Sequence, residues 1–446
     1  MNVYRRILYI CGQIGMMVLA RFFFTWILGF GDTTPAHAGP ETVTGSDVSI
    51  PLFTLFSGAA IGAALIGFRI FDGITDPLAG ILSDLWVRRG RQRRSLLWFS
   101  TVVPPVGLAL CFAPTHAMDP GTRWFLLVAG MFLFFVGYTF YGIPYWSLIE
   151  DYGGDNANER RLLSNLLGAG LVIATAIAGL VSPLLVESYG YAKAALAFAI
   201  PAGVLMLLPY FAAPKGFQSS ASAVQKRRIS LFVTLIDAFH HRRFVSVLVM
   251  FSGSQMSFTI MTAASVFIAG DLLGGTEADV ARIMGPFLAT AIPAFVLVPR
   301  FSRMLGWENA ILVASLALGL VYAASAGLGE SWIGGRWMTA SIVFALAGPM
   351  AAVLLGLEGE AITACARERG AADCVGIYFG VFNFIVKALN GLAIWIVGWL
   401  LDLSKIPEYG TAAIRAMSLT AGGLLAVCVF IYFIIRPHRE DTEIAS

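Results

Sequence analysis

Long apolar stretches separated by short polar segments run through the whole sequence. Each stretch reaches the roughly 20 residues that an α-helix needs to cross the hydrocarbon core of a bilayer. The pattern therefore predicts an all-α membrane protein with twelve transmembrane helices. The predicted spans lie near residues 7–30, 52–82, 95–114, 124–149, 162–185, 191–213, 244–270, 280–299, 309–328, 338–357, 376–401 and 411–435.

The composition agrees with a membrane protein. Hydrophobic residues make up 58% of the 446 residues and charged residues 13%, about half of the usual quarter. The mean hydropathy is +0.77. These values exclude a disordered chain, a coiled coil and a secreted disulfide scaffold. The net charge of +3 is too small to indicate a nucleic-acid partner.

The sequence lacks the motifs of common enzyme classes. It has no Walker A loop, no HExxH and no GxSxG with suitable partners, so we expect no enzyme activity. The five cysteines form no CxxC pair and the five histidines are scattered along the chain. We therefore expect no protein metal site and no bound cofactor.

The basic residues predict the orientation. They gather in alternate loops, and the loop at 31–50 has no Lys or Arg at all. The positive-inside rule then places both termini in the cytoplasm, with the chain in the plasma (inner) membrane. A cleaved signal peptide is the alternative at the N-terminus, because Ala36-His37-Ala38 resembles a cleavage site. The first apolar run exceeds the roughly 7–15 residues of a signal core, which favours a transmembrane helix.

The longest inner segment divides the chain into two halves. Residues 214–243 carry two basic clusters and are interpreted as a cytoplasmic linker. It would connect an N-terminal six-helix bundle, 1–213, with a C-terminal one, 244–446. Similar glycine- and arginine-containing segments close the second and the eighth predicted spans, as expected for two related halves.

The second predicted span contains an unusual charge cluster. Arg69, Asp72 and Asp76 are spaced by three and four residues, which puts them on one helix face. Each charge costs at least about 2.5–3.5 kcal/mol at mid-bilayer. Their sum is −1, so one Na⁺ or one proton would neutralise the cluster, and oxygen ligands suit a hard cation. The alternative is a structural Arg69–Asp72 pair with Asp76 beside a kink at Pro77.

Other polar and aromatic residues within predicted spans are candidates for contacting a substrate. Lys387 could anchor a substrate, replace the cation in the empty state, or extend its amine to the membrane surface. Aromatic residues at helical spacing also occur in ordinary packing. The further candidates are Arg21, Gln13, Tyr138, Trp146, Gln255 and Asn383.

Several motifs resemble the glycoside–pentoside–hexuronide:cation symporters of the major facilitator superfamily. The similarity extends over most of the chain, and the motif in the second span is the most specific. The matching stretches are Arg69-x-x-Asp72-x-x-x-Asp76-Pro77-x-x-Gly80-x-x-x-Asp84, Ile143-Pro144-Tyr145-Trp146-Ser147-Leu148, Gly376-x-Tyr378-Phe379 leading to Lys387, and Tyr9-x-x-Gly12-x-x-Gly15.

The resemblance implies a major facilitator fold with a cation site at Asp72, Asp76 and Thr139. It also implies that Trp146 lies near the substrate and that Lys387 is the lysine of the eleventh helix. The chain departs from the sugar carriers where they have charged residues that hold sugar hydroxyls. Those positions are Met17, Gly142, and Leu166 or Leu167. Cation coupling is therefore better supported than a sugar substrate.

Together these observations predict a monomeric secondary transporter that works by alternating access. It would couple Na⁺ or H⁺ to the symport of a small organic solute such as a sugar or glycoside, with membrane lipids as its surroundings. A carrier of lysolipid or another amphiphile and an uncoupled facilitator are the alternatives. Asp84, with Arg88 and Arg91, is expected to form a cytoplasmic gate.

Overall fold

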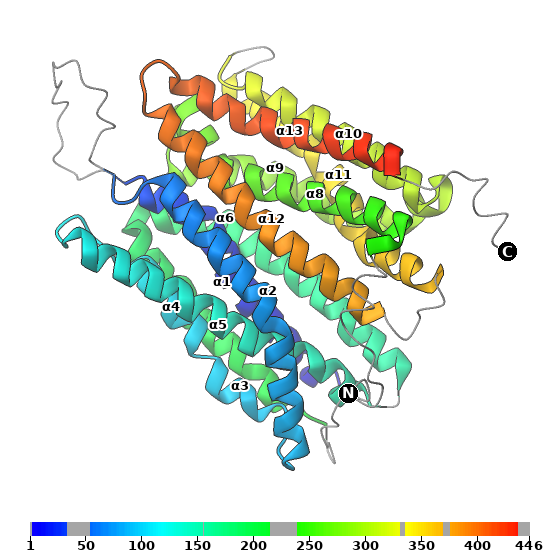
Figure 1. The fold of residues 1–446 in the computed structure, drawn as a ribbon. Coiled ribbons are helices and arrows are strands. Elements are labelled where there is room, and N and C mark those ends of the chain that lie inside the picture. Colours follow the sequence, from blue (N-terminus) through cyan, green and yellow to red (C-terminus); the bar gives the residue numbers. More distant parts are fainter. Residues whose placement is uncertain are drawn as a thin grey trace. The chain divides into compact units, whose positions relative to one another are not determined.

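The computed structural model describes residues 2–33, 54–154, 156–214, 239–330, 335–368 and 375–435. The described residues form helices and no strand (Figure 1). Their bounds are α1 (Val3–Gly31), α2 (Gly58–Arg88), α3 (Ser95–Ser100), α4 (Val103–Cys111), α5 (Pro120–Gly153), α6 (Ala157–Leu207), η1 (Leu208–Ala212), α8 (Arg242–Phe267), η3 (Ile268–Leu272), η4 (Glu277–Asp279), α9 (Val280–Leu305), α10 (Trp307–Ala324), η5 (Ser325–Gly327), α11 (Arg336–Glu368), α12 (Val375–Ser404) and α13 (Gly410–Ile435).

Most of the predicted spans correspond to one long helix each. Ten of the described helices are long and apolar enough to cross a membrane, which confirms an all-α, multi-pass membrane protein. α6 covers the 162–185 span and, together with η1, nearly all of the 191–213 span. Gly190, at φ 77°, interrupts the helical geometry of α6 between the two spans. The predicted span at 95–114 is divided between α3 and α4. The total of twelve spans stays a prediction.

The chain divides into two compact units. One comprises Met1–Lys226 with Thr276–Ala281, and the other comprises Arg227–Gly275 with Arg282–Ser446. Residues 215–238 of the predicted linker lie outside the described part of the chain. All residues of the predicted cation site belong to the first unit.

Tyrosines hold the first unit together near its predicted site. α1 packs along α6, and both α2 and α4 pack against α5. Tyr145 of α5 donates a hydrogen bond to the carbonyl of Tyr9 in α1 at 2.7 Å, and the two rings stack 5.1 Å apart. Tyr141 donates to the carbonyl of Met206 at 2.6 Å. These buried contacts fix α5 against α1 and α6.

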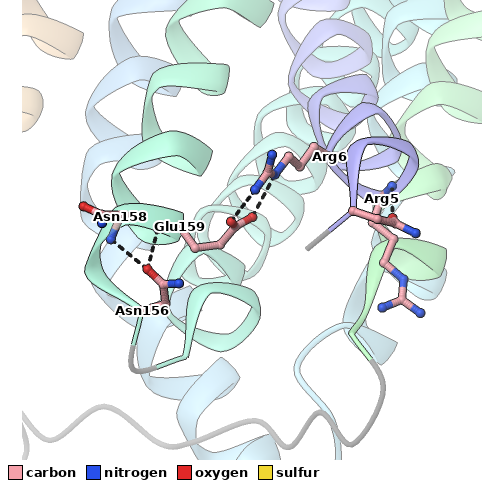
Figure 2. A network of polar contacts seen from close by, with 6 residues as sticks. Arg5, Arg6, Asn156, Asn158 and Glu159 are labelled. Atoms are coloured by element: carbon pink, nitrogen blue, oxygen red, sulfur yellow. Dashed lines mark hydrogen bonds and ion pairs between the residues drawn. The ribbon is translucent and has the colours of Figure 1, made fainter.

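An ion pair joins the starts of α1 and α6. Arg6 donates two hydrogen bonds to the carboxylate of Glu159, at 3.0 and 2.6 Å (Figure 2). Asn156 caps α6, because its side chain accepts from the backbone N–H groups of Asn158 and Glu159. A side-chain cap of this kind satisfies donors that the first helical turn leaves unpaired. The two contacts set how α6 enters the unit beside α1.

Glycines allow close helix packing in the second unit. α13 packs against α8, α10 and α12, and Figure 1 shows α13, in red, beside α10. A Cβ atom on Gly422 of α13 would lie 2.5 Å from the carbonyl oxygen of Gly319 in α10 and 2.8 Å from the backbone nitrogen of Ala323. Small residues permit such approach between membrane helices, where packing replaces the hydrophobic driving force.

We expect Gly422→Val to destabilise the second unit by about 1–3 kcal/mol, the usual cost of overpacking. Gly423 offers a matched control, because a Cβ there meets nothing within 4 Å, so Gly423→Val should leave stability nearly unchanged. The thermal midpoints of the purified variants in detergent test this expectation. Equal midpoints for the two variants would contradict close packing of α10 and α13.

Candidate cation and substrate site

Two acids of α2 and one hydroxyl of α5 converge inside the first unit. Thr139 donates a hydrogen bond to Asp72 Oδ1, and its Oγ1 lies 3.4 Å from Asp76 Oδ1. The side chains of Asp72 and Thr139 are 0% and 2% exposed, and Asp76 is half-buried. The structure thus brings together the three residues that the sequence assigns to a cation site.

Arg69 forms the ion pair that the sequence raised as an alternative. Its Nη1 lies 3.2 Å from Asp72 Oδ2, and its guanidinium is 5.2 and 5.9 Å from the ring centres of Phe24 and Phe135. Its Nε has no hydrogen-bond partner among the described residues. The pair uses Oδ2 of Asp72, whereas Oδ1 faces Thr139. Asp72 therefore takes part in both contacts. Its Oδ2 pairs with Arg69, and its Oδ1 belongs to the group of three oxygens formed with Thr139 and Asp76.

Thr139 has a single hydrogen to offer these two carboxylates. A threonine hydroxyl carries a single hydrogen, and ionised carboxylates only accept. Thr139 can therefore donate to Asp72 or to Asp76 but not to both at once. A proton or a small cation between the oxygens would interact with both carboxylates at once. No group of three or more His, Cys, Asp or Glu side chains could hold a metal ion within the described ranges.

Two side-chain hydrogen bonds also join α1 to α5 beside this cluster. Trp146 donates from Nε1 to Gln13 Oε1 at 3.1 Å, and the hydroxyl of Tyr138 donates to the sulfur of Met17 at 3.6 Å. Gln13 and Met17 are one helical turn apart on α1. On α5, Tyr138, Gly142 and Trp146 also follow one another at intervals of one turn. The structure thus places the predicted residues Gln13, Tyr138 and Trp146 along one contact between antiparallel helices.

Arg21 lies one helical turn after Met17 on α1. It is half-buried and interacts electrostatically with Tyr138. Tyr138 in turn interacts electrostatically with the two arginines and two acids around it, Asp72, Arg69, Arg21 and Asp76. The predicted substrate candidates of α1 and α5 are therefore neighbours of the predicted cation site.

The second unit contains its own buried polar contacts. Gln255 of α8 donates to Glu358 of α11 at 2.7 Å, and Thr259 donates to Asn390 of α12 at 2.9 Å. Lys387, one turn before Asn390 on α12, is half-buried, whereas the predicted residue Asn383 is exposed. Gln255, one of the predicted candidates in this unit, thus has the half-buried acid Glu358 as its partner.

Glu358 is a polar residue that the sequence analysis missed. The predicted span ends at residue 357, one residue before Glu358. In the structure, α11 continues to Glu368 and includes this acid. A helix signal extending through the Gly-Glu-Ala-Ile-Thr-Ala segment could have found it. The acid lies within one of the ten candidate membrane spans, Arg336–Cys365.

The predicted gate residue Asp84 pairs with Arg93, which follows Arg88 and Arg91 in the same arginine-rich segment. Arg93, only 2% exposed, donates to Asp84 at 2.7 Å, to Asp151 at 2.8 Å and to Ser83 at 3.0 Å. Arg91 instead lies over the ring of Trp86, 4.2 Å from its centre. Arg88 is exposed at the end of α2. Asp84 is thus tied to α5 within the first unit through Arg93, and gating itself stays a prediction.

Solved structures of transporters share this fold. The structure of the nucleoside transporter NupG has a TM-score of 0.66 and 16% identity, covering 98% of this chain and 100% of that chain. A bacterial homologue of the human lysosomal transporter Spinster has a TM-score of 0.67 and 16% identity, covering 98% and 97%. A proton-dependent oligopeptide transporter has a TM-score of 0.64 and 13% identity, covering 97% and 100%. At these identities the likeness establishes the fold alone.

The family profile that matches residues 54–435, together with the membrane-spanning helices, defines a multi-pass membrane transporter of the major facilitator superfamily. The profile of the family described as MFS/sugar transport protein matches residues 54–435, so the chain belongs to this family. No curated protein shows significant sequence similarity to the chain. The family assignment agrees with the resemblance to cation symporters of this superfamily.

Proposed function

We propose that the protein is a secondary active transporter that couples a monovalent cation, Na⁺ or H⁺, to the symport of a small organic solute. Asp72, Asp76 and Thr139 hold the cation. The observation that carries this proposal is their convergence inside membrane-spanning helices, with one hydroxyl hydrogen shared between two carboxylates. Such a group of oxygens is stabilised by a bound positive charge.

The bound cation acts through a difference in affinity. A cation between α2 and α5 stabilises the conformations in which the three oxygens stay close. A solute that prefers those conformations binds more tightly when the cation is present, and the cation then binds more tightly with the solute by the same factor. An ion gradient can drive accumulation only through this difference between states.

Gradient-driven uptake into proteoliposomes tests the proposal. Labelled sugars and labelled lysolipids serve as probes, with an imposed Na⁺ or H⁺ gradient. We expect the parent protein to accumulate one probe under one of the gradients. Asp76→Asn removes one carboxylate charge but leaves the Arg69–Asp72 pair intact, so accumulation should fall to simple equilibration.

Asp402→Asn is the matched control. Asp402 lies near the end of α12 and pairs with Lys405 at 3.4 Å, remote in sequence from the cluster. Its neutral variant should accumulate the probe as the parent does. Full accumulation by Asp76→Asn would remove the case for this cation site.

The two alternatives have distinct outcomes in the same assay. An uncoupled facilitator would equilibrate the probe and ignore both gradients. A carrier of lysolipid or another amphiphile would accept the lysolipid and reject the sugars. Met17 and Gly142 favour a solute with fewer hydroxyls than a sugar, because neither residue can hold a hydroxyl with a charged group.

A further inference from the structure

Arg21 is a charged side chain in a membrane-spanning helix without a counter-charge of its own. In the part of the chain that the structure describes, it has no ion pair and no hydrogen bond, and its electrostatic neighbour is Tyr138. Arginine stays protonated in proteins, so it cannot escape the cost by neutralisation. A guanidinium at this depth is costly unless an anion accompanies it.

The nearest acids already have other partners. Asp72 forms an ion pair with Arg69 and accepts from Thr139. Asp76 lies at Thr139, on the α2 side of α5. Arg21 instead follows Gln13 and Met17 on α1 at spacings of four residues, which puts all three on the helix face that contacts α5.

The charges around Tyr138 sum to zero when both acids are ionised. Arg21 and Arg69 contribute two positive charges, and Asp72 and Asp76 contribute two negative charges, all within electrostatic reach of the Tyr138 ring. Binding one Na⁺ or one proton at the acids changes this sum to +1. The cation-loaded group then carries an excess positive charge in a low-dielectric environment, where charges interact strongly.

We propose that the transported solute is a monovalent organic anion whose carboxylate or phosphate binds at Arg21 and the hydroxyl of Tyr138. This inference rests on the proposed cation site, because the cation creates the charge that the anion neutralises. Cation and anion then bind as an electrically neutral pair. The guanidinium suits both kinds of anion, since its fork of N–H donors matches carboxylate and phosphate geometry.

The residues of α1 and α5 that accompany Arg21 and Tyr138 are aromatic, apolar or uncharged polar. Beyond the guanidinium lie the hydroxyl of Tyr138, the indole of Trp146 and the side chain of Gln13. A Cβ atom on Gly142 would lie 3.3 Å from the sulfur of Met16 and 3.5 Å from the Trp146 ring. This stretch therefore offers aromatic and thioether surface next to one fixed positive charge.

Thermal stabilisation of the purified protein in lipid nanodiscs tests the proposal with two matched pairs of probes. D-gluconate and D-glucitol differ in a carboxylate against a hydroxymethyl group. Lysophosphatidate and monoacylglycerol differ in a phosphate, and this arm separates a lipid phosphate from a carboxylate. We expect the acid of at least one pair to raise the thermal midpoint at concentrations where its neutral partner has no effect.

Arg21→Gln and Arg21→Lys show whether the arginine is responsible. Arg21→Gln should lose the response to the acid, whereas Arg21→Lys, which keeps the charge, should retain part of it. Arg21→Gln should also bind the coupling cation more tightly, on the order of tenfold. The reason is that the variant loses one positive charge that repels the cation in a low-dielectric environment. A merely structural arginine would not produce this second change.

Asp76→Asn separates failure of this inference from failure of the proposed cation site. The variant carries the +1 charge of the loaded state permanently, so it should bind the acid without any added cation. Retained cation binding in Asp76→Asn would overturn the cation site alone. Equal responses to acid and neutral partners, no response to either acid, or an unchanged acid response in Arg21→Gln would overturn the anion inference.

Discussion

Asp72→Asn is expected to abolish cation binding and, unlike Asp76→Asn, to destabilise the first unit as well. Asp72 is fully buried and is the ion-pair partner of Arg69, whose side chain is 12% exposed. Removing one partner of a buried pair leaves an uncompensated charge and costs about 3–5 kcal/mol. Asp76→Asn leaves the Arg69–Asp72 pair intact, so its loss of stability should be smaller than that of Asp72→Asn.

A double variant separates the two effects of Asp72→Asn. Arg69→Met removes the stranded guanidinium, so Asp72→Asn combined with Arg69→Met should recover most of the lost stability without recovering cation binding. Thermal midpoints and binding of labelled sodium to the purified variants measure the two quantities. If Asp72→Asn were as stable as Asp76→Asn, the Arg69–Asp72 pair would have no structural role.

Arg93→Met is expected to have the other large effect. Arg93 is 2% exposed and joins Asp84 of α2 to Asp151 of α5. Without the guanidinium, the carboxylates of Asp84 and Asp151 lose the positive charge between them. We expect the free energy of unfolding to fall by about 3–5 kcal/mol.

Arg91→Met serves as the control for Arg93→Met. Arg91 is exposed and its guanidinium lies over the ring of Trp86 in a cation–π contact, which is worth about 0.5–1 kcal/mol at exposed sites. Thermal midpoints of the purified proteins compare the two variants. An Arg93→Met variant as stable as Arg91→Met would contradict the buried pairing.

The sequence predicted the parts of the molecule that depend on local pattern. Apolar length predicted the membrane helices, and spacings of three and four residues placed Arg69, Asp72 and Asp76 on one face of α2. Boundaries were less certain, because apolar length does not show where a helix ends. The early end assigned to the span at 338–357 accordingly hid Glu358.

Contacts between helices could not be predicted from spacing. Arg93 is one of several arginines between α2 and α3, and nothing in the local sequence distinguishes it from Arg88 or Arg91. Its role becomes visible only when α5 brings Asp151 beside Asp84. The contact of Trp146 with Gln13 likewise depends on how α1 packs against α5.

Helix α5 presents consecutive residues to two different neighbours. Thr139 faces the acids of α2, whereas Tyr138 contacts α1 through Met17. A helix is stiff over so short a distance, so it cannot turn one of these surfaces without turning the other. A small rotation of α5 on ion binding would therefore move the residues that contact the solute at the same time. No further residues would be needed to couple the ion site to the solute site.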